Sequence, residues 1–202
     1  MLDGSEPAGD GGARVVQPSA PGEGVRELAA EDLAELEERP HTDADVEFLH
    51  GMIPHHAQAL EMTSLVADRT DNEDVTLLAR RIEVSQESEI ELMEDWLEAR
   101  DEPAAGPHME HGHGGHGLMP GMLSDGQMAR LAAAQGSEFN RLFCRLMIQH
   151  HRGALVMVAE LREAGGGLDP EVYRLSSDIE ADQEIEIRRM EEMLAGTFGE
   201  GL

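Results

Sequence analysis

From Phe48 to Met62 the chain reads Phe-Leu-His-Gly-Met-Ile-Pro-His-His-Ala-Gln-Ala-Leu-Glu-Met, and a matching stretch runs from Phe143 to Met157. The second stretch reads Phe-Cys-Arg-Leu-Met-Ile-Gln-His-His-Arg-Gly-Ala-Leu-Val-Met. Phenylalanine, methionine, isoleucine, the histidine pair, alanine, leucine and the last methionine recur in register. We infer an internal duplication whose preserved part consists of histidine and thioether side chains.

A second set of repeated positions follows each histidine pair and predicts the fold. Ile82, Gln86, Glu89, Ile90, Met93 and Leu97 match Ile179, Gln183, Glu186, Ile187, Met190 and Leu194. Apolar residues recur at helical spacing in both sets, so each repeat is predicted to be a helical hairpin. Two such hairpins bury their apolar stripes against each other, which predicts an all-α, ferritin-like four-helix bundle.

Capping residues and helix breakers place the boundaries of these segments. We expect a disordered tail over 1–40 with a short helix near 25–38, and hairpins over 41–100 and 124–196. Residues 101–123 form a His/Met-rich linker, and 41–196 form one bundle domain. The long helices are predicted near 42–68, 72–100, 138–164 and 170–195, with no β-strand anywhere. The linker is long enough for either a short turn or a crossover along the bundle.

Composition limits the partners of the chain. Of its 202 residues, 42 are acidic and 15 basic, for a formal net charge of -27. Such a chain repels phosphate, so nucleic acid and anionic membrane are excluded as partners. No apolar run is long enough to span a membrane, although a lipid anchor stays open. The single cysteine, Cys144, excludes an internal disulfide and is expected to pack in the core.

Helical periodicity places the repeated histidines and methionines on the inward face of their helices. The predicted ligands are Met52, His55, His56, Met62, Met147, His150, His151 and Met157. Thioether sulfur is a soft donor that selects Cu(I), and imidazole binds both copper states, so the pattern favours copper over iron or zinc. One shared site and two separate sites both fit the sequence. Packing alone also fits, because methionine at helical spacing often fills cores.

Other repeated polar positions could orient the imidazole rings from behind. These predicted supporting residues are Asp45, Gln86, Glu89, Asn140, Gln183 and Glu186. Interhelical hydrogen bonding is the alternative role for them. A di-iron site would need inward Glu-x-x-His motifs. Glu47 and His50 have that spacing but are placed on the outer face, so ferroxidase chemistry is disfavoured.

The linker carries its own metal-binding pattern. Imidazole, thioether and glycine alternate in it, and a flexible tract of this kind can wrap a metal ion without a preformed cavity. Its secondary candidate ligands are His108, Met109, His111, His113, His116, Met119 and Met122.

The repeated Met-Ile-x-His-His-x-x-Ala-Leu-x-Met, followed in each copy by Gln-x-x-Glu-Ile-x-x-Met, resembles the domain-of-unknown-function 305 family. The resemblance covers about residues 41–196. It implies a ferritin-like bundle in an exported bacterial protein, secreted or at the cell surface, in a family some of whose members are associated with copper binding and tolerance. It also carries over the eight bundle ligands named above, while Asn140 and Cys144 depart from the first repeat.

These observations give one leading hypothesis and two others. The leading one is an exported copper-binding protein that sequesters the ion or transfers it, with a copper-donor or acceptor protein as partner and with homo-oligomers open. The second is a metal-dependent redox enzyme in which Glu89 or Glu186 would supply acid-base chemistry. The third is a structural or stress-related interaction module without metal. The sequence favours a non-enzymatic role.

Overall fold

The computed structural model describes residues 16–17, 26–27, 41–103 and 118–196, and contacts divide the chain into two units, 1–40 and 41–202. In the first unit, β1 (Val16–Gln17) pairs antiparallel with β2 (Arg26–Glu27). The expectation of no strand is therefore wrong at these residues. Arg26 and Glu27 also do not belong to the short helix expected near 25–38, whose remaining residues lie outside the described ones.

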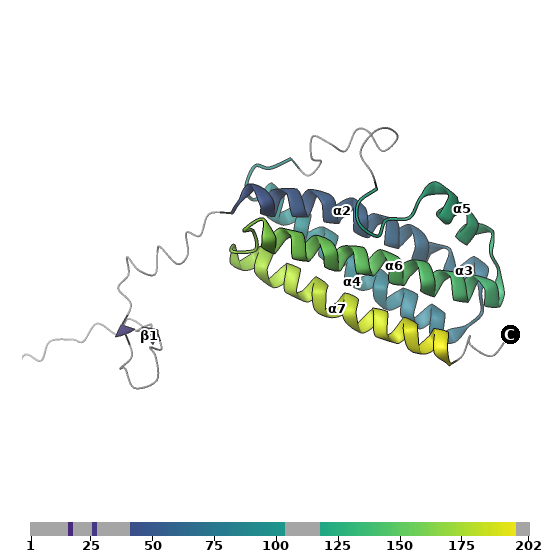
Figure 1. Cartoon of the computed structure of the whole chain (residues 1–202). Helices are drawn as coiled ribbons and strands as arrows, with labels where there is room; N and C mark the ends of the chain where they lie inside the picture. The colour runs from purple at the N-terminus through teal and green to yellow at the C-terminus, as the bar shows by residue number, and fades with distance from the viewer. Residues whose placement is uncertain (1–15, 18–25, 28–40, 104–117, 197–202) are drawn as a thin grey trace, which may run out of the picture. The chain divides into compact units, whose positions relative to one another are not determined.

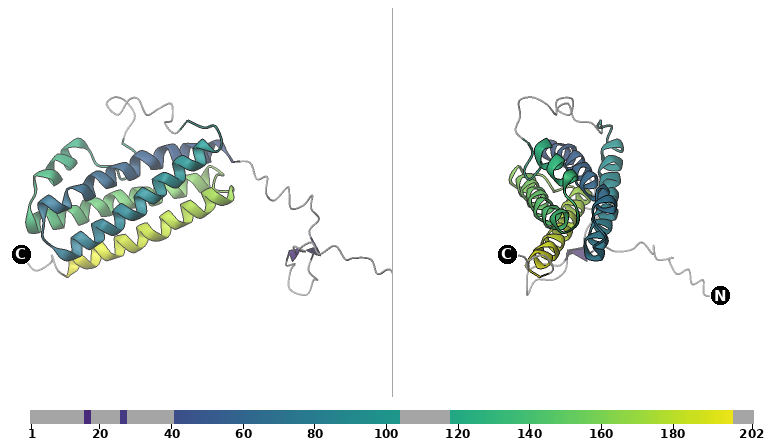
Figure 2. Two further views of the ribbon diagram at one scale, coloured as in Figure 1. Left: turned by 180° about the vertical axis from the view of Figure 1, so that it is seen from behind. Right: turned by 90° about the vertical axis from the view of Figure 1, so that its right-hand side faces the viewer.

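The second unit is the all-α four-helix bundle that the sequence predicts. Its elements are α2 (Asp43–Ser64), α3 (Val66–Arg69), α4 (Glu73–Glu98), α5 (Asp125–Ala133), α6 (Gly136–Glu163) and α7 (Pro170–Ala195). Figure 1 shows the four long helices side by side, and the end-on view in Figure 2 shows them around a common core. α2 packs with α4 and α6 with α7, as two hairpins. The predicted first long helix is interrupted at Leu65, after which α3 begins as a separate turn.

Polar side chains cap the helices where the sequence predicts them to begin. Thr42 and Asp45 form a reciprocal capping box at the start of α2, and Ser124 and Gln127 form another at α5. Asn72 accepts a hydrogen bond from a backbone N–H of α4. These caps satisfy N–H groups that the first helical turn leaves without partners.

The contacts between helix ends show that the linker is a crossover. The N–H of Gly167, after α6, donates to Asp45 at the start of α2, so these two helices are antiparallel. Arg189 near the end of α7 pairs with Asp74 at the start of α4, so α4 and α7 are also antiparallel. α4 therefore ends at the opposite end of the bundle from where α6 begins. The connection must run the length of the bundle, as in ferritin-like folds.

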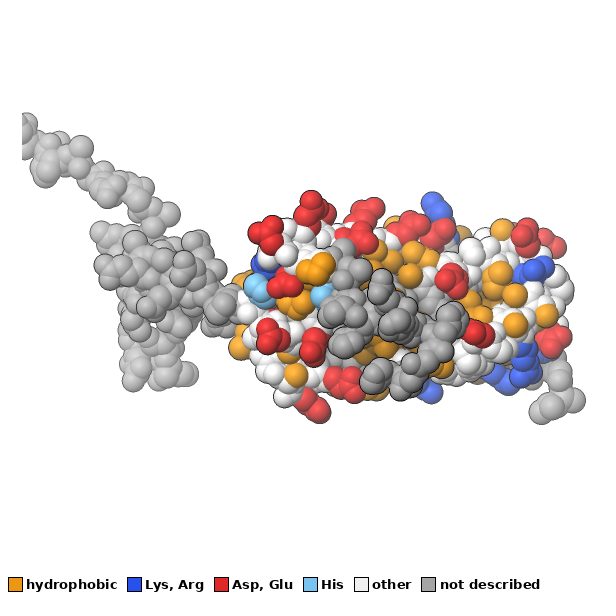
Figure 3. All heavy atoms as spheres, turned by 90° about the horizontal axis from the view of Figure 1, so that it is seen from above, with side chains coloured by type: hydrophobic (Ala, Val, Ile, Leu, Met, Phe, Trp, Pro, Cys, Tyr) orange, Lys and Arg blue, Asp and Glu red, His pale blue; other side chains and the backbone are white. Residues whose placement is uncertain are grey.

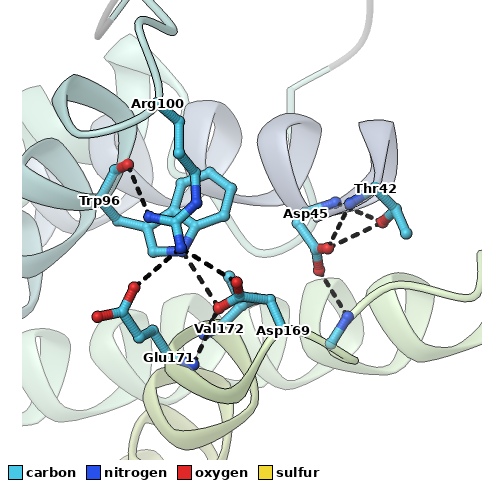
Figure 4. Close-up of polar contacts among 8 residues, drawn as sticks. Thr42, Asp45, Trp96, Arg100, Asp169, Glu171 and Val172 are labelled. Atoms are coloured by element: carbon cyan, nitrogen blue, oxygen red, sulfur yellow. Dashed lines mark hydrogen bonds and ion pairs between the residues drawn. The ribbon is translucent and has the colours of Figure 1, made fainter. Parts of the chain in front are cut away.

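A clamp of charged and aromatic side chains closes the end of the bundle where α4 meets α7 (Figure 4). The Arg100 guanidinium lies 4.0 Å above the Trp96 ring and donates to Asp169 and Glu171. Asp169 also caps α7 and accepts from the Trp96 indole. Burial opposes ionisation of Asp169, but these hydrogen bonds and Arg100 hold its pKa below the usual value. The clamp fixes the ends of the two hairpins against each other.

The apolar core is divided in two by a polar layer that crosses all four long helices. One cluster contains Phe48, Trp96 and Leu161, and the other contains Phe139, Phe143 and Ile82. Between them lie the members of the polar layer: His55, His56, Gln86, Glu89, His150, His151, Gln183 and Glu186. A buried layer of this kind is unfavourable unless its groups find partners. The polar layer is therefore the candidate functional site of the bundle.

The surface matches the acidic composition. Asp and Glu side chains are spread over the face shown in Figure 3, with arginines at few places. Within the part of the chain that the structure describes, no helix is both long and apolar enough to cross a bilayer.

Candidate metal site

The four repeated histidines meet in the middle of the polar layer. His55 and His56 come from α2, and His150 and His151 come from α6. All four side chains are fully buried. The rings of His55 and His150 face each other with centroids 3.9 Å apart and planes inclined by 36°. The helical periodicity that predicts an inward face is thus correct for both pairs.

Carboxylates hold one histidine of each pair in a defined tautomer. His56 Nε2 lies 2.7 Å from Glu89 Oε2, and His151 Nε2 lies 2.8 Å from Glu186 Oε2. An ionised carboxylate only accepts, so each Nε2 carries the proton and donates it. Each Nδ1 is then left with a lone pair. Neither Nδ1 has a hydrogen-bond partner among the described residues.

The other two histidines also present nitrogens without partners. His55 Nε2 donates to the carbonyl oxygen of Pro120 at 3.0 Å, which leaves its Nδ1 as a bare acceptor. Neither ring nitrogen of His150 has a partner within the described part of the chain. An unsatisfied buried polar group costs roughly 1–3 kcal/mol. Several such groups lie in this one layer of the core.

Burial keeps the central pair uncharged. It lowers the pKa of His55 to about 3, and the neighbouring His56 and His151 add to the effect, although the hydrogen bond to Pro120 opposes it. Burial also lowers the pKa of His150 well below its usual value. Electrostatic repulsion from His55, His151 and His56 lowers it further. A neutral imidazole with a free lone pair is the form that ligates metal ions. Neither ring of the central pair therefore carries a positive charge at neutral pH.

Methionines flank the histidine layer on both sides. Met52, Met93 and Met157 are buried in one apolar cluster, and Met62, Met147, Met190 and Met193 are buried in the other. The sequence did not put forward Met93, Met190 or Met193 as ligands. The signal was present for Met93 and Met190, which recur in the second repeated set. Each of the two apolar clusters therefore contains several thioether sulfurs.

The last residues of the linker form a strap, residues 118–123, which packs across α2 and α6. Met119 is partly buried against the Met52 cluster. A Cβ built on Gly51 would lie 3.5 Å from Met119 Sδ and 3.1 Å from Met157 Cε, so the two methionines converge above Gly51. Met122 is half-buried in the same strap. Of the linker candidates, Met119 thus lies beside Met157, a predicted bundle ligand, while His108, Met109, His111, His113 and His116 lie outside the described residues.

The predicted supporting residues divide into three groups. Glu89 and Glu186 bind imidazoles, whereas Asp45 binds Thr42 and Gly167 at the end of the bundle. The contacts of Asp45 thus assign it to helix capping and not to histidine positioning. Gln86 and Gln183 are buried in the layer, and Asn140 is buried among the first residues of α6. In each of these three, at least one side-chain atom has no partner among the described residues.

Three further residues occupy the places expected of them. Cys144 is buried in the apolar core, and burial raises the pKa of its thiol to about 12. Glu47 is exposed, and His50 binds the carbonyl oxygen of Pro103. Across residues 41–103 and 118–196, no three His, Cys, Asp or Glu side chains are arranged to hold a metal ion.

Comparison with known proteins places this arrangement in a family. Residues 22–194 match the family described as "Domain of unknown function (DUF305)". The chain belongs to the DUF305 family. The bundle resembles a candidate secreted DUF305 protein from Streptomyces coelicolor, with 34% identity and a TM-score of 0.68 over 79% of this chain and 96% of that chain. A DUF305 fragment from Deinococcus radiodurans is 35% identical with a TM-score of 0.67, over 77% of this chain and 98% of that one.

A third DUF305-like structure was solved with metals. CopM in the Cu(I)-bound form is 29% identical, with a TM-score of 0.62 over 77% of this chain and 98% of that chain. CopM was also solved in Cu(II)-bound and Ag-bound forms. A curated viral relative, "Uncharacterized protein L153" of Acanthamoeba polyphaga mimivirus, is 39% identical over 56 residues. That match spans 28% of this chain and 37% of the viral protein.

Proposed function

We propose that this DUF305 protein binds copper as cargo in the histidine layer and sequesters it there for tolerance or later transfer. The observation that carries the proposal is a set of buried imidazole nitrogens that have no hydrogen-bond partner among the described residues. His56 and His151 each donate one N–H to a carboxylate, and His55 donates one to a backbone carbonyl. Histidines that ligate metals are held in this way by their second nitrogen.

The central pair is the proposed first binding point. His55 Nδ1 and both nitrogens of His150 are without partners among the described residues, and the two rings face each other. Cu(I) tolerates few ligands and accepts soft donors. A cuprous ion bound to nitrogens at the edges of these rings would complete its coordination with thioether sulfur from either side of the layer. The eight repeated histidines and methionines named from the sequence are the proposed ligand set, together with Met119 from the linker candidates and with Met93 and Met190 added from the structure.

The comparisons support handling of a soft metal. CopM has been crystallised with Cu(I), Cu(II) and silver, and silver(I) shares the preference of Cu(I) for sulfur. We propose that the linker histidines capture copper first and that the bundle then retains it. Because the Streptomyces relative is described as a candidate secreted protein, we also propose that this chain acts outside the cytoplasm.

A competition titration tests the proposal. Purified protein without a His tag is titrated with Cu(I) against bicinchoninate under anaerobic conditions. One variant changes His55, His56, His150 and His151 to alanine, and a matched variant changes His108, His111, His113 and His116 to serine. We expect the bundle variant to lose the tight site and the linker variant to retain it. Equal binding by the bundle variant and the wild type would refute the bundle site.

A further inference from the structure

A groove between α4 and α7 leads from the surface toward the histidine layer. The two helices lie along one side of the bundle, as the rear view in Figure 2 shows, and they pack less closely than the helices within each hairpin. The groove contains two adjoining hollows of about 740 and 290 Å³, which share Leu77 and Arg81 as lining residues. Its walls carry exposed apolar side chains, including Leu77, Leu92 and Ile185.

The floor of this groove is formed by the two carboxylates that hold the imidazoles. Glu89 lines the larger hollow and Glu186 the smaller one. Each uses Oε2 for its histidine, and its other oxygen contacts a groove residue. Glu89 Oε1 accepts weakly from Ser85 Oγ at 3.5 Å, and Glu186 Oε1 lies 3.6 Å from Arg81 Nε. Each carboxylate therefore stands between the groove and a buried imidazole.

The opposite side of the layer is closed by backbone. Pro120 and Gly121 of the strap press against Gly153 of α6 so tightly that a Cβ on Gly153 would overlap the Pro120 carbonyl group. Gln58 fastens the same strap by donating to the Leu123 carbonyl and accepting from its N–H. Opening that side requires moving main chain, whereas opening the groove side requires only side-chain rotation. Rotation of a side chain is generally faster than a collective backbone movement.

We infer that the α4–α7 groove is the route by which the cation enters and leaves the histidine layer, with Glu89 and Glu186 as its inner gate. This inference rests on the proposed function, since it names the path to the same site. The carboxylates attract the ion at the groove floor. They then transfer it to the imidazoles that are hydrogen-bonded to their Oε2 atoms. We call Arg81 the latch of this gate, because its guanidinium forms ion pairs with Glu186 and Asp182 at the groove wall.

Blocking the groove at a position away from the ligands tests the route. Ser88 is exposed and lines the larger hollow, so Ser88→Trp places an indole in the groove. Ser137→Trp makes the same change on an exposed residue at the start of α6, outside the groove. Stopped-flow transfer of Cu(I) from bicinchoninate gives the loading rate, and equilibrium titration gives the stoichiometry. Circular dichroism checks that both variants keep their helices.

We expect Ser88→Trp to slow loading by about tenfold or more, with unchanged stoichiometry, while Ser137→Trp loads at the wild-type rate. Arg81→Gln removes the latch and should speed loading by several-fold. Wild-type loading rates in both Ser88→Trp and Arg81→Gln would overturn the route and leave the bundle site standing. If wild-type protein takes up no Cu(I), the proposed function and the route both fail.

Discussion

His56 and Glu89 are joined across two helices by a hydrogen bond of 2.7 Å from the imidazole Nε2 to the carboxylate Oε2. His151 and Glu186 repeat this contact at 2.8 Å in the other hairpin. The contact fixes which nitrogen carries the proton, and so it leaves Nδ1 free to ligate. In each hairpin, a residue on the second helix thus orients a proposed ligand on the first.

Removing this carboxylate should weaken copper binding without abolishing it. Loss of a group that orients a metal-ligating histidine typically lowers affinity by about 10–100-fold. We expect Glu89→Ala to fall in this range in the Cu(I) competition titration. The control is Glu87→Ala, an exposed residue on the same helix, which should bind as the wild type does. Equal affinities for the two variants would show that Glu89 has no positioning role.

The metal-free protein should lose stability as the pH falls below about 6.5. Burial lowers the pKa of His55 to about 3 and that of His150 well below its usual value, so as the pH falls below about 6.5 the unfolded chain binds more protons than the native state. Protonation then favours unfolding, by roughly 1.4 kcal/mol per pH unit for each histidine. Chemical denaturation at pH 7.5 and pH 5.0, with a chelator present, measures this.

A leucine at position 150 isolates the contribution of His150 to that loss. Because leucine does not titrate, the stability of His150→Leu relative to the wild type should improve as the pH falls from 7.5 to 5.0. Carboxylates that titrate at acidic pH affect both proteins alike. If the difference between the two proteins does not change with pH, His150 is not held neutral by burial.

The glycine beneath the strap should not tolerate a side chain. Gly153→Ala would push the Pro120 carbonyl group away from α6, and overpacking of this kind costs about 1–3 kcal/mol of unfolding free energy. Gly126→Ala is the matched control, since a Cβ there meets nothing closer than Ser124 Oγ at 4.0 Å. That control should be neutral or stabilising by up to roughly 1 kcal/mol. Thermal and urea unfolding measure both variants. Equal stabilities would show that the strap is not packed tightly against Gly153.

The end clamp should matter more than a surface ion pair. Asp169 caps α7 and accepts from both Trp96 and Arg100, so Asp169→Ala should lower the free energy of unfolding by about 1–3 kcal/mol. Glu180→Ala removes a carboxylate that pairs with Arg162 on the surface, where both side chains are well exposed. Its effect should be about 0–1 kcal/mol. Denaturant midpoints that rank the two variants in the opposite order would contradict this account.

Much of this fold could be predicted because its signals are local. The starts of three helices are marked by their N-cap residues Thr42, Asn72 and Ser124, and the repeated apolar spacing defines the inward faces. The two histidine pairs could be placed in the core from the same spacing. The crossover could not be predicted, because a long linker permits either path. Only contacts far apart in sequence, such as Gly167 with Asp45, decide between them.

The details of the site depended on contacts between elements. Asp45 looked like a partner of the histidines because it shares their helix face, but it lies near the helix start, where capping takes its carboxylate. Met93 and Met190 could have been found as ligand candidates from their repetition. The strap could not, since nothing in the sequence places Pro120 beside His55. The two strands near 16 and 27 pair only two residues each, too few to leave a periodic signal.

X-ray absorption at the copper edge tests the central claim most directly. The sample is the variant in which the four linker histidines are serine, loaded anaerobically with one equivalent of Cu(I). We predict a mixed shell of imidazole nitrogen and thioether sulfur around the bound ion, because His55 and His150 lie between two groups of methionines. A shell of oxygen and nitrogen without sulfur, or a spectrum unchanged when the four bundle histidines are replaced, would contradict the account.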